Sequence, residues 1–464
     1  MPTTEQSITT ALDLTRVRSQ FPSLSQTVNG YPAVFFDGPG GTQVPQRVID
    51  AISGYLRENN ANTGGAYATS RRTDAMIAQA RAAMADFFHC AADEVVFGPN
   101  MTTLTYAMSR AIGREFKPGD EILLTRLDHD ANFTPWVQMA EDHGVTVRVA
   151  EFREEDCTLD ISDLASKINK NTKLVAVGYA SNAVGTINPV KKIIHLAHEA
   201  GAIAYIDAVH YAPHGLIDVA ALDCDFLVCS TYKFFGPHMG VLYGKREHLQ
   251  RFRPYKVRPL TDSVPLRWEW GTLNHECIAG IAACVDYIAD LGRPSSEQRL
   301  PQPMPTRISL GGNTEDQPRV PHPSRFSKGG NDGPEVISRR AAIEAAYAAI
   351  HEHERELLER MMTGLKSIPS LKTYGITDPA RFDERCGTFA VRDVSGKLGR
   401  TPLELATKLA ERGFFTWDGN YYALNVTERL DVERTGGFLR IGLVHYNTME
   451  EVERLLAALN EILG

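Results

Sequence analysis

The sequence predicts an α/β fold in which a large domain, built on a mostly parallel sheet flanked by helices, is followed by a smaller C-terminal α/β domain. Three observations support this fold. Short apolar runs alternate with amphipathic stretches from residue 33 to 292, a Pro- and Gly-rich stretch interrupts the pattern from 293 to 334, and helices and strands resume from 335 to 464. Strands that alternate with crossover helices form parallel sheets, and their ligands bind beyond the carboxyl ends of the strands. We therefore expect the functional residues at those ends.

The length and charge of the chain narrow the classes of function. Its 464 residues exceed what one hydrophobic core ordinarily supports, so two domains are expected. The net charge is −8, without the basic surplus of nucleic-acid binders, and a small-molecule substrate is expected. No apolar run approaches the length of about 20 residues that spans a bilayer, and the N-terminal stretch MPTTEQSITTALDLTRVRSQ lacks the pattern of a signal peptide. We expect a cytoplasmic protein that binds neither nucleic acid nor membrane.

The cysteines indicate a reducing compartment. All seven are scattered along the chain, and none has CxxC spacing. This arrangement argues against a disulfide framework and against a zinc site. We expect reduced thiols, most of them in the core, and no metal centre.

The strands of the large domain, residues 33–292, are predicted from seven apolar runs. In chain order they are DEVVFG, DEILLT, GVTVRV, TKLVAVG, GAIAYID, DFLVCS and GVLYG. Turn residues bound each run, and amphipathic stretches separate the runs. Near-continuous apolar runs are typical of parallel strands because such strands are covered on both faces.

The rest of the chain is divided by its composition. Residues 1–32 are expected to pack with the small domain. Residues 293–334 are rich in Pro, Gly and Ser with little periodicity, and we interpret them as an insertion or a mobile cover. A long helix is predicted at about 335–365, and Thr448 with Glu451 forms a capping box that begins the last helix.

Two charged residues follow neighbouring strands of the predicted sheet. Lys233 comes three residues after the end of DFLVCS, beside Phe234 and Phe235, where an amine can lose proton affinity and become a nucleophile toward an aldehyde. Asp207 ends GAIAYID, and a carboxylate at the end of a buried strand requires a cation. A protonated pyridine nitrogen, as in a pyridoxal cofactor, is such a partner. A solvated lysine and a surface acid are the simpler interpretations of each residue alone.

A candidate phosphate site follows the strand VVFG. The helix that begins near Met101, Thr102 and Thr103 offers free backbone N–H groups with hydroxyls beside them, and Ser230 can add another hydroxyl. Ordinary helix capping explains the same residues.

Three further residues complete the candidate site. His129 follows the strand DEILLT, where its ring could stack on a planar cofactor, and Asn182 follows another strand, where its amide could donate to a ring hydroxyl. Arg440 lies in an apolar strand of the small domain, where its planar guanidinium matches a carboxylate. A solvated histidine, a turn asparagine and a structural ion pair are the respective alternatives.

The shared position of these residues supports a cofactor site more strongly than any single residue does. Lys233, Asp207, His129, Asn182 and the turn at 101–103 all follow strands of one predicted sheet. Unrelated surface residues would not be expected to cluster in this way. The sequence therefore predicts an enzyme that binds pyridoxal 5'-phosphate.

The same residues, in this order, resemble the class V aminotransferase family, and within it the cysteine desulfurases and selenocysteine lyases. The motifs that carry the resemblance are FFDGPGGTQVP, LDHDANFTPW, SNAVGTINPV, IDAVHYAPH, STYKFFGP, WEWGTLN and LRIGLVHYNT. The resemblance implies a fold-type-I enzyme that acts on a small amino acid. It also implies a homodimer with active sites at the subunit interface.

The resemblance further implies roles for the matching residues. Lys233 would carry the cofactor as a Schiff base, Asp207 would pair with its pyridine nitrogen, His129 would stack on its ring, and Arg440, with Asn182, would bind the substrate. Contacts to the cofactor are implied for Met101, Thr102, Asn182, His210, Ser230, Tyr232 and, from the neighbouring subunit, Thr272.

Three departures from the family pattern bear on the reaction. His210 stands where the family usually has glutamine, and Tyr232 stands where a histidine usually precedes the lysine. Tyr422, in the loop WDGNYYALNV, stands near the place of the catalytic cysteine of the desulfurases. Because a persulfide requires a thiolate nucleophile, we rank cleavage of the carbon–sulfur bond by β-elimination first. An aminotransferase, an epimerase and a non-catalytic cofactor-binding regulator are the alternatives.

Overall fold

The large domain is built on a seven-stranded sheet in the order β4-β10-β9-β8-β7-β5-β6. The computed structural model describes residues 12–294, 337–396 and 400–464. The strands are, in spatial order, β4 (Val95–Gly98), β10 (Gly240–Gly244), β9 (Phe226–Ser230), β8 (Ile203–Asp207), β7 (Thr172–Gly178), β5 (Glu121–Thr125) and β6 (Thr146–Ala150). All seven predicted strands are confirmed, and the sheet is mostly parallel. Only β10 runs antiparallel to its neighbours, because the short link after β9 leaves no room for a crossover.

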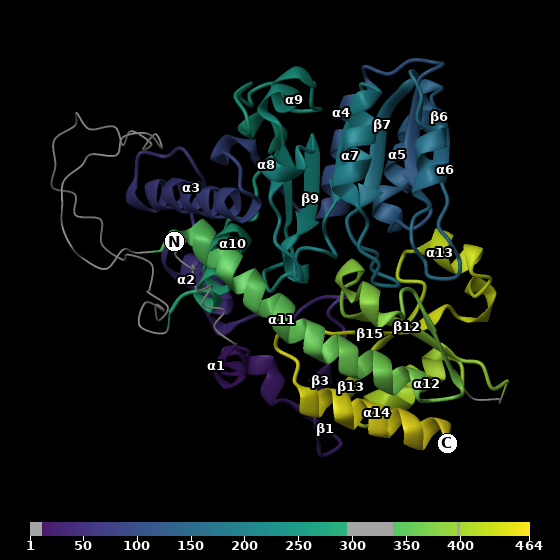
Figure 1. Cartoon of the computed structure of the whole chain (residues 1–464). Helices are drawn as coiled ribbons and strands as arrows, with labels where there is room; N and C mark the ends of the chain where they lie inside the picture. Colours follow the sequence, from purple (N-terminus) through teal and green to yellow (C-terminus); the bar gives the residue numbers. More distant parts are fainter. Residues whose placement is uncertain (1–11, 295–336, 397–399) are drawn as a thin grey trace, which may run out of the picture.

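Helices cover both faces of this sheet (Figure 1). They are α2 (Gln46–Glu58), α3 (Ala68–Phe88), α4 (Met101–Gly113), α5 (Thr134–His143), α6 (Ile161–Lys167), α7 (Val190–Glu199), α8 (Val219–Leu222), α9 (Arg246–Arg251) and α10 (His275–Leu291). Side chains alternate along each strand: Leu227 and Cys229 pack with α3, α7 and α10, whereas Phe226 and Val228 pack with α4 and α5. Burial on both faces explains the apolar runs in the sequence.

The small domain holds a four-stranded antiparallel sheet in the order β11-β12-β15-β14. Its elements are β11 (Leu371–Tyr374), β12 (Thr388–Asp393), β14 (Trp417–Gly419), β15 (Phe438–Gly442), α12 (Pro402–Ala410), α13 (Leu424–Arg429) and α14 (Met449–Leu463). The capping box of Thr448 and Glu451 is present at the start of α14. A short strand, β13 (Phe414–Phe415), pairs with β3 (Val34–Phe35), which joins the start of the chain to this domain.

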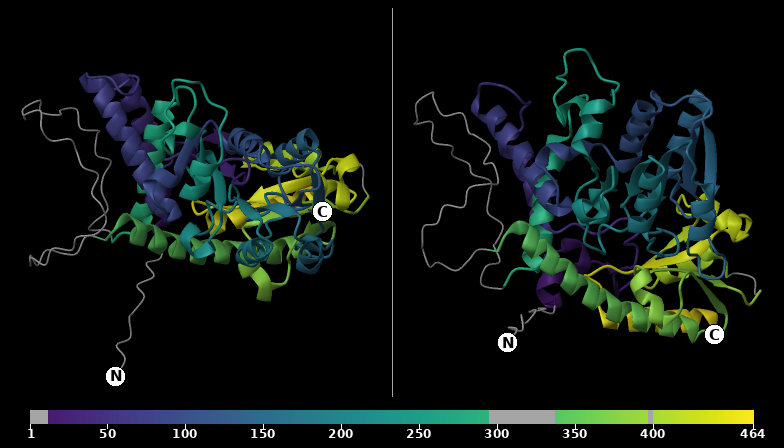
Figure 2. Two further views of the ribbon diagram at one scale, coloured as in Figure 1. Left: turned by 90° about the horizontal axis from the view of Figure 1, so that it is seen from above. Right: turned by 45° about the horizontal axis from the view of Figure 1, so that its top comes forward.

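The long helix α11 (Arg339–Lys366) runs along both domains (Figures 1 and 2). Residues 342–350 pack in the core of the large domain, and residues 357–365 pack in the core of the small domain. The predicted insertion lies almost entirely outside the described residues.

The N-terminal segment also contacts the small domain. It contains α1 (Leu14–Ser19), β1 (Thr27–Val28) and β2 (Tyr31–Pro32). Arg18 donates to the carbonyl of Tyr446 at 2.7 Å and pairs with Glu451 at 2.9 Å. Among the described helices, none is both long and apolar enough to span a membrane.

Candidate active site

Two adjoining cavities lie beyond the carboxyl ends of β5, β7, β8 and β9. We call them the inner cavity, of about 560 Å³, and the outer cavity, of about 490 Å³. The residues that line both are Pro39, Thr102, His129, Asn182, Tyr232 and Lys233. Lys233 therefore stands at the junction of the two spaces.

The structure brings together ten of the eleven residues to which the resemblance assigns a role. The inner cavity is lined by Lys233, Asp207, His129, Met101, Thr102, Asn182, His210, Ser230 and Tyr232. Arg440 lines the outer cavity. Thr272 lies on an exposed loop and lines neither cavity; it lines an adjoining space that shares Thr103 and His238 with the inner cavity.

Lys233 is held at the end of a single 3-10 turn that follows β9. Its Nζ donates to the carbonyl of Pro39 at 2.5 Å and to that of Gly40 at 3.0 Å. Burial lowers the pKa of the amine to about 7, and the nearby charge of Arg440 adds to this shift. An amine with this pKa is partly neutral at physiological pH and can attack an aldehyde.

Asp207 is a buried carboxylate with spare hydrogen-bonding capacity. It ends β8, is 6% exposed and accepts one hydrogen bond, from the backbone N–H of Val209 at 2.9 Å. No described lysine or arginine forms an ion pair with it, and burial raises its pKa to about 6. A protonated ring nitrogen in the inner cavity would supply the missing partner.

A second buried carboxylate in the same cavity, Asp128, has a different environment. It accepts hydrogen bonds from the backbone of Gly178, the hydroxyl of Thr125 and the amide of Asn132. Burial raises its pKa to about 7. Groups of the protein therefore fill the hydrogen-bonding capacity of Asp128, whereas Asp207 remains available to a ligand. Asp128 was not among the residues predicted from the sequence.

His129 offers a neutral ring to both cavities. Its Nδ1 accepts from the backbone N–H of Ala131 at 3.0 Å, so the ring proton lies on Nε2. Burial and the charge of Lys233 lower its pKa to about 3. The ring of Tyr422 stacks on the ring of His129, with centroids 5.6 Å apart.

The start of helix α4 faces the inner cavity. Asn100 caps the helix by accepting from Thr103 N at 2.8 Å, and the hydroxyl of Ser230 accepts from Met101 N at 3.0 Å. β10 approaches closely here because Gly240 has no side chain: a Cβ would lie 2.4 Å from the carbonyl carbon of Asn100. A helix start with hydroxyls beside it suits a phosphate group.

Two residues that depart from the family pattern also line the inner cavity. The Nε2 of His210 lies 3.0 Å from the hydroxyl of Thr388 in the small domain, and burial lowers the pKa of this histidine. Tyr232 stacks on His238 with ring centroids 4.7 Å apart. Both rings therefore have protein partners as well as a cavity face.

Arg440 is buried in β15 and points into the outer cavity. Its guanidinium donates to the carbonyl of Asn182 at 3.1 Å and to Asp37 at 3.4 Å, and it lies 4.1 Å from the ring of Tyr421. Its Nε is buried without a hydrogen-bond partner. The contact to Asp37 is long and single, so Arg440 retains donors for a carboxylate.

The loop before α13 covers the outer cavity with two tyrosines. Tyr421 is buried and its hydroxyl donates to the carbonyl of Phe438, whereas Tyr422 is 73% exposed. Both have positive φ, at 56° and 60°. None of the seven cysteines, all of which are described, lines either cavity.

Asp37 and Tyr421 are site residues that the sequence analysis did not single out. Two features of the sequence could have indicated them: Asp37 directly follows an apolar run, and Tyr421 directly precedes Tyr422 in the loop that stands near the place of the catalytic cysteine.

Sequence comparisons relate this chain to one family of known proteins. A sequence model of the family described as Aminotransferase class-V matches residues 34–307 and 304–455. The chain is 32% identical to a cysteine desulfurase of Pectobacterium atrosepticum over 96% of this chain and 97% of that protein, and 31% identical to one of Dickeya dadantii over 96% of each.

Solved structures show the same fold. The apo structure of a cysteine desulfurase from Thermococcus onnurineus superposes with a TM-score of 0.78 at 25% identity, covering 98% of each chain. The cysteine desulfurase CsdA of Escherichia coli superposes with a TM-score of 0.75 at 22% identity, covering 98% of this chain and 100% of that chain.

Proposed function

Because the chain belongs to the class V aminotransferase family, a family of pyridoxal-phosphate enzymes, we propose that it cleaves the carbon–sulfur bond of a small sulfur-containing amino acid by β-elimination. The similar proteins named cysteine desulfurases support the substrate class. The two adjoining cavities support the arrangement, because one suits a cofactor and the other suits an amino acid that meets it at Lys233.

The residues of the inner cavity fit pyridoxal 5'-phosphate. The available carboxylate of Asp207 would hold the pyridine nitrogen, and the neutral ring of His129 would stack on the cofactor ring. The start of α4 and the hydroxyl of Ser230 would hold the phosphate, and Asn182, whose Oδ1 is buried without a partner, would contact the ring or the substrate. When bound, the cofactor supplies an electron sink that acidifies the Cα proton of an amino acid.

Lys233 and Arg440 would handle the substrate. Arg440 would bind the α-carboxylate and so orient the amino acid in the outer cavity. Lys233 would first anchor the cofactor and then, once the substrate amine has displaced it, take the proton from Cα. Its pKa of about 7 suits both removal and return of a proton.

One observation supports this choice of reaction: no cysteine lines the outer cavity, and Tyr422 occupies its covering loop. A tyrosine cannot accept sulfur as a thiolate does. The sulfur would therefore leave as sulfide or as a thiol. For cysteine, the balanced reaction consumes water and yields pyruvate, ammonia and hydrogen sulfide.

Product analysis tests this proposal. The cofactor-loaded enzyme is incubated with a panel of small amino acids that includes cysteine, and the products are identified by mass. Pyruvate with sulfide or a thiol is the expected result. Alanine with protein-bound sulfur, a new amino acid with a keto acid, or an inverted stereocentre would each contradict elimination in favour of desulfuration, transamination or epimerisation.

We also propose that the enzyme is a homodimer. Thr272 is exposed in the single chain and lines neither cavity of that chain, as expected of a residue that completes the site of a second copy. Light scattering should give twice the mass of the chain, and Thr272→Ala should weaken phosphate binding. A cytoplasmic location stays a prediction that cell fractionation can check.

A further inference from the structure

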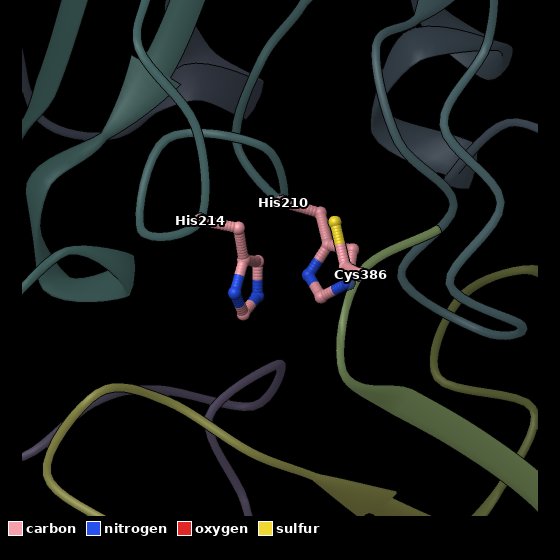
Figure 3. Close-up of side chains that lie close together, drawn as sticks. All are labelled: His210, His214 and Cys386. Atoms are coloured by element: carbon pink, nitrogen blue, oxygen red, sulfur yellow. The ribbon is translucent and has the colours of Figure 1, made fainter. Parts of the chain in front are cut away.

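Three buried side chains with metal-ligand chemistry meet between the two domains. Their donor atoms all lie within 4.8 Å of one another, and the residues, His210, His214 and Cys386, are 4%, 6% and 3% exposed. Figure 3 shows the two imidazole rings side by side, with one nitrogen of each turned toward the other and Cys386 beside His210. The histidines follow β8 of the large domain, and the cysteine precedes β12 of the small domain.

The outward nitrogen of each ring already has an oxygen partner. His214 Nδ1 lies 2.7 Å from the carboxylate of Glu354 on α11, and His210 Nε2 lies 3.0 Å from the hydroxyl of Thr388. A histidine that binds a metal typically donates its other N–H to such an oxygen, which fixes the ring and its tautomer. Both rings are thus oriented with their remaining nitrogen toward the cluster.

The inward nitrogen of His214 has no partner. Its Nε2 is fully buried without a hydrogen bond, and the side chain is 4% exposed. Buried polar atoms are ordinarily satisfied, so an unpaired one calls for a partner such as a water or an ion. Donation from Nδ1 to Glu354 leaves a lone pair on Nε2, which is the electron pair that a cation needs.

We propose that His210, His214 and Cys386 bind a thiophilic divalent cation, with Zn²⁺ as the preferred ion. Two imidazoles and one thiolate are borderline-soft ligands, a set that suits zinc better than calcium or magnesium. Tetrahedral zinc would require donors separated by roughly 3.3–3.6 Å, so side-chain rotations of about 1 Å would complete the site. On binding, the ion displaces the thiol proton into solvent.

A route to this site exists. A cavity of about 1100 Å³ is lined by His214, Glu354 and Cys386, together with residues of α7 and α11. Water in this cavity could occupy the fourth position of the metal. His210, in contrast, lines the inner cavity.

Bound metal would have two structural consequences. It would link the large domain, through the histidines, to the small domain, through Cys386. It would also fix the ring of His210 at the wall of the inner cavity. The scattered cysteines predict no zinc site from the sequence, but folding brings together His210 and Cys386, which are 176 positions apart.

Metal binding to the cofactor-loaded, tag-free protein tests the proposal. After dialysis against a chelator, the protein is titrated with Zn²⁺, and bound zinc and the thermal unfolding midpoint are measured. We expect about one zinc per chain and a higher midpoint. Cys386→Ser and His214→Ala should abolish both effects, and Glu354→Gln should weaken affinity about 10–100-fold.

Two control variants separate this site from other ligands. Cys224→Ser removes a different buried thiol, and His195→Ala removes an exposed histidine at the large cavity. Both should bind zinc as the unaltered protein does. Equal binding by all variants, or no binding by the unaltered protein, would overturn the proposal.

A spectroscopic measurement avoids any dependence on the folding of variants. Co²⁺ added to the unaltered, cofactor-loaded protein should give intense tetrahedral d–d bands and a thiolate-to-cobalt charge-transfer band. Cobalt bound without the thiolate band would exclude Cys386 as a ligand and overturn the assignment.

Discussion

The inner and outer cavities share Lys233 but are built in different ways. Strand ends of one sheet supply most of the inner cavity, and most of its groups are buried or half-buried. Some are held by neighbouring residues, as Asp207 is by Val209, and others by distant segments, as Lys233 is by Pro39. The outer cavity depends on the small domain, whose loop carries Tyr422, 73% exposed, on a backbone with positive φ. We infer that the sheet edge determines cofactor chemistry, whereas the packing of the second domain determines which bond is broken.

The largest effect is expected at the junction. Lys233→Ala should lower the exchange of the substrate Cα proton in heavy water by about 10²–10⁴-fold, because it would remove the proposed acid–base group. Proton exchange followed by mass spectrometry measures this change. Exchange at the original rate would show that another residue transfers the proton, and it would contradict the role of Lys233 at the junction of the two cavities.

A smaller effect is expected at the inner cavity. Asp207→Asn should lower kcat by about 10–150-fold, the worth of one hydrogen bond to a charged group, with little change in the unfolding midpoint. Asp128→Asn is the matched control: it disrupts bonds within the protein, so it should lower stability by about 1–3 kcal/mol. Steady-state kinetics and thermal unfolding distinguish the two variants. Lower stability for Asp207→Asn together with lower kcat for Asp128→Asn would mean that Asp128, rather than Asp207, serves the cofactor.

At the outer cavity, Arg440→Lys keeps the charge but loses the planar fork. We expect KM for the amino acid to rise about tenfold with a smaller change in kcat, because one hydrogen bond to the carboxylate is lost. Initial rates over a range of substrate concentrations provide the test. An unchanged KM together with reduced stability would assign Arg440 to a structural pair with Asp37.

The smallest effect is a dependence on pH. Burial lowers the pKa of Lys233 from 10.5 to about 7, so the amine is neutral above that pH and protonated below it. The rate at which cofactor-free protein takes up the cofactor should therefore rise about threefold from pH 6.5 to 7.5 and level off above. Stopped-flow absorbance measures the rate, and a flat profile would contradict a depressed pKa.

The inner cavity could be predicted from the sequence because its residues directly follow apolar strands. Lys233 comes three residues after β9, and Asp207 ends β8, so the order of strands alone places them at one edge. The rule that ligands bind beyond the carboxyl ends of parallel strands can be applied to the sequence without knowing how distant segments pack.

The outer cavity could be predicted only in part. Arg440 was recognised as a buried cation, but its contact with Asp37 joins residues 403 positions apart. The cluster of His210 and Cys386 likewise forms through packing of the two domains. The spacing of residues along the chain does not predict such contacts. They depend on how the two domains pack together, which involves helix α11 in both cores.

The proposed function depends on Lys233 as the residue that carries the cofactor at the junction of the two cavities. Reduction of the cofactor-loaded protein with borohydride, followed by digestion and mass spectrometry, locates that residue. The geometry predicts a stable cofactor adduct on the peptide that contains Lys233. An adduct on another lysine, or an unmodified Lys233 in active enzyme, would contradict the assignment.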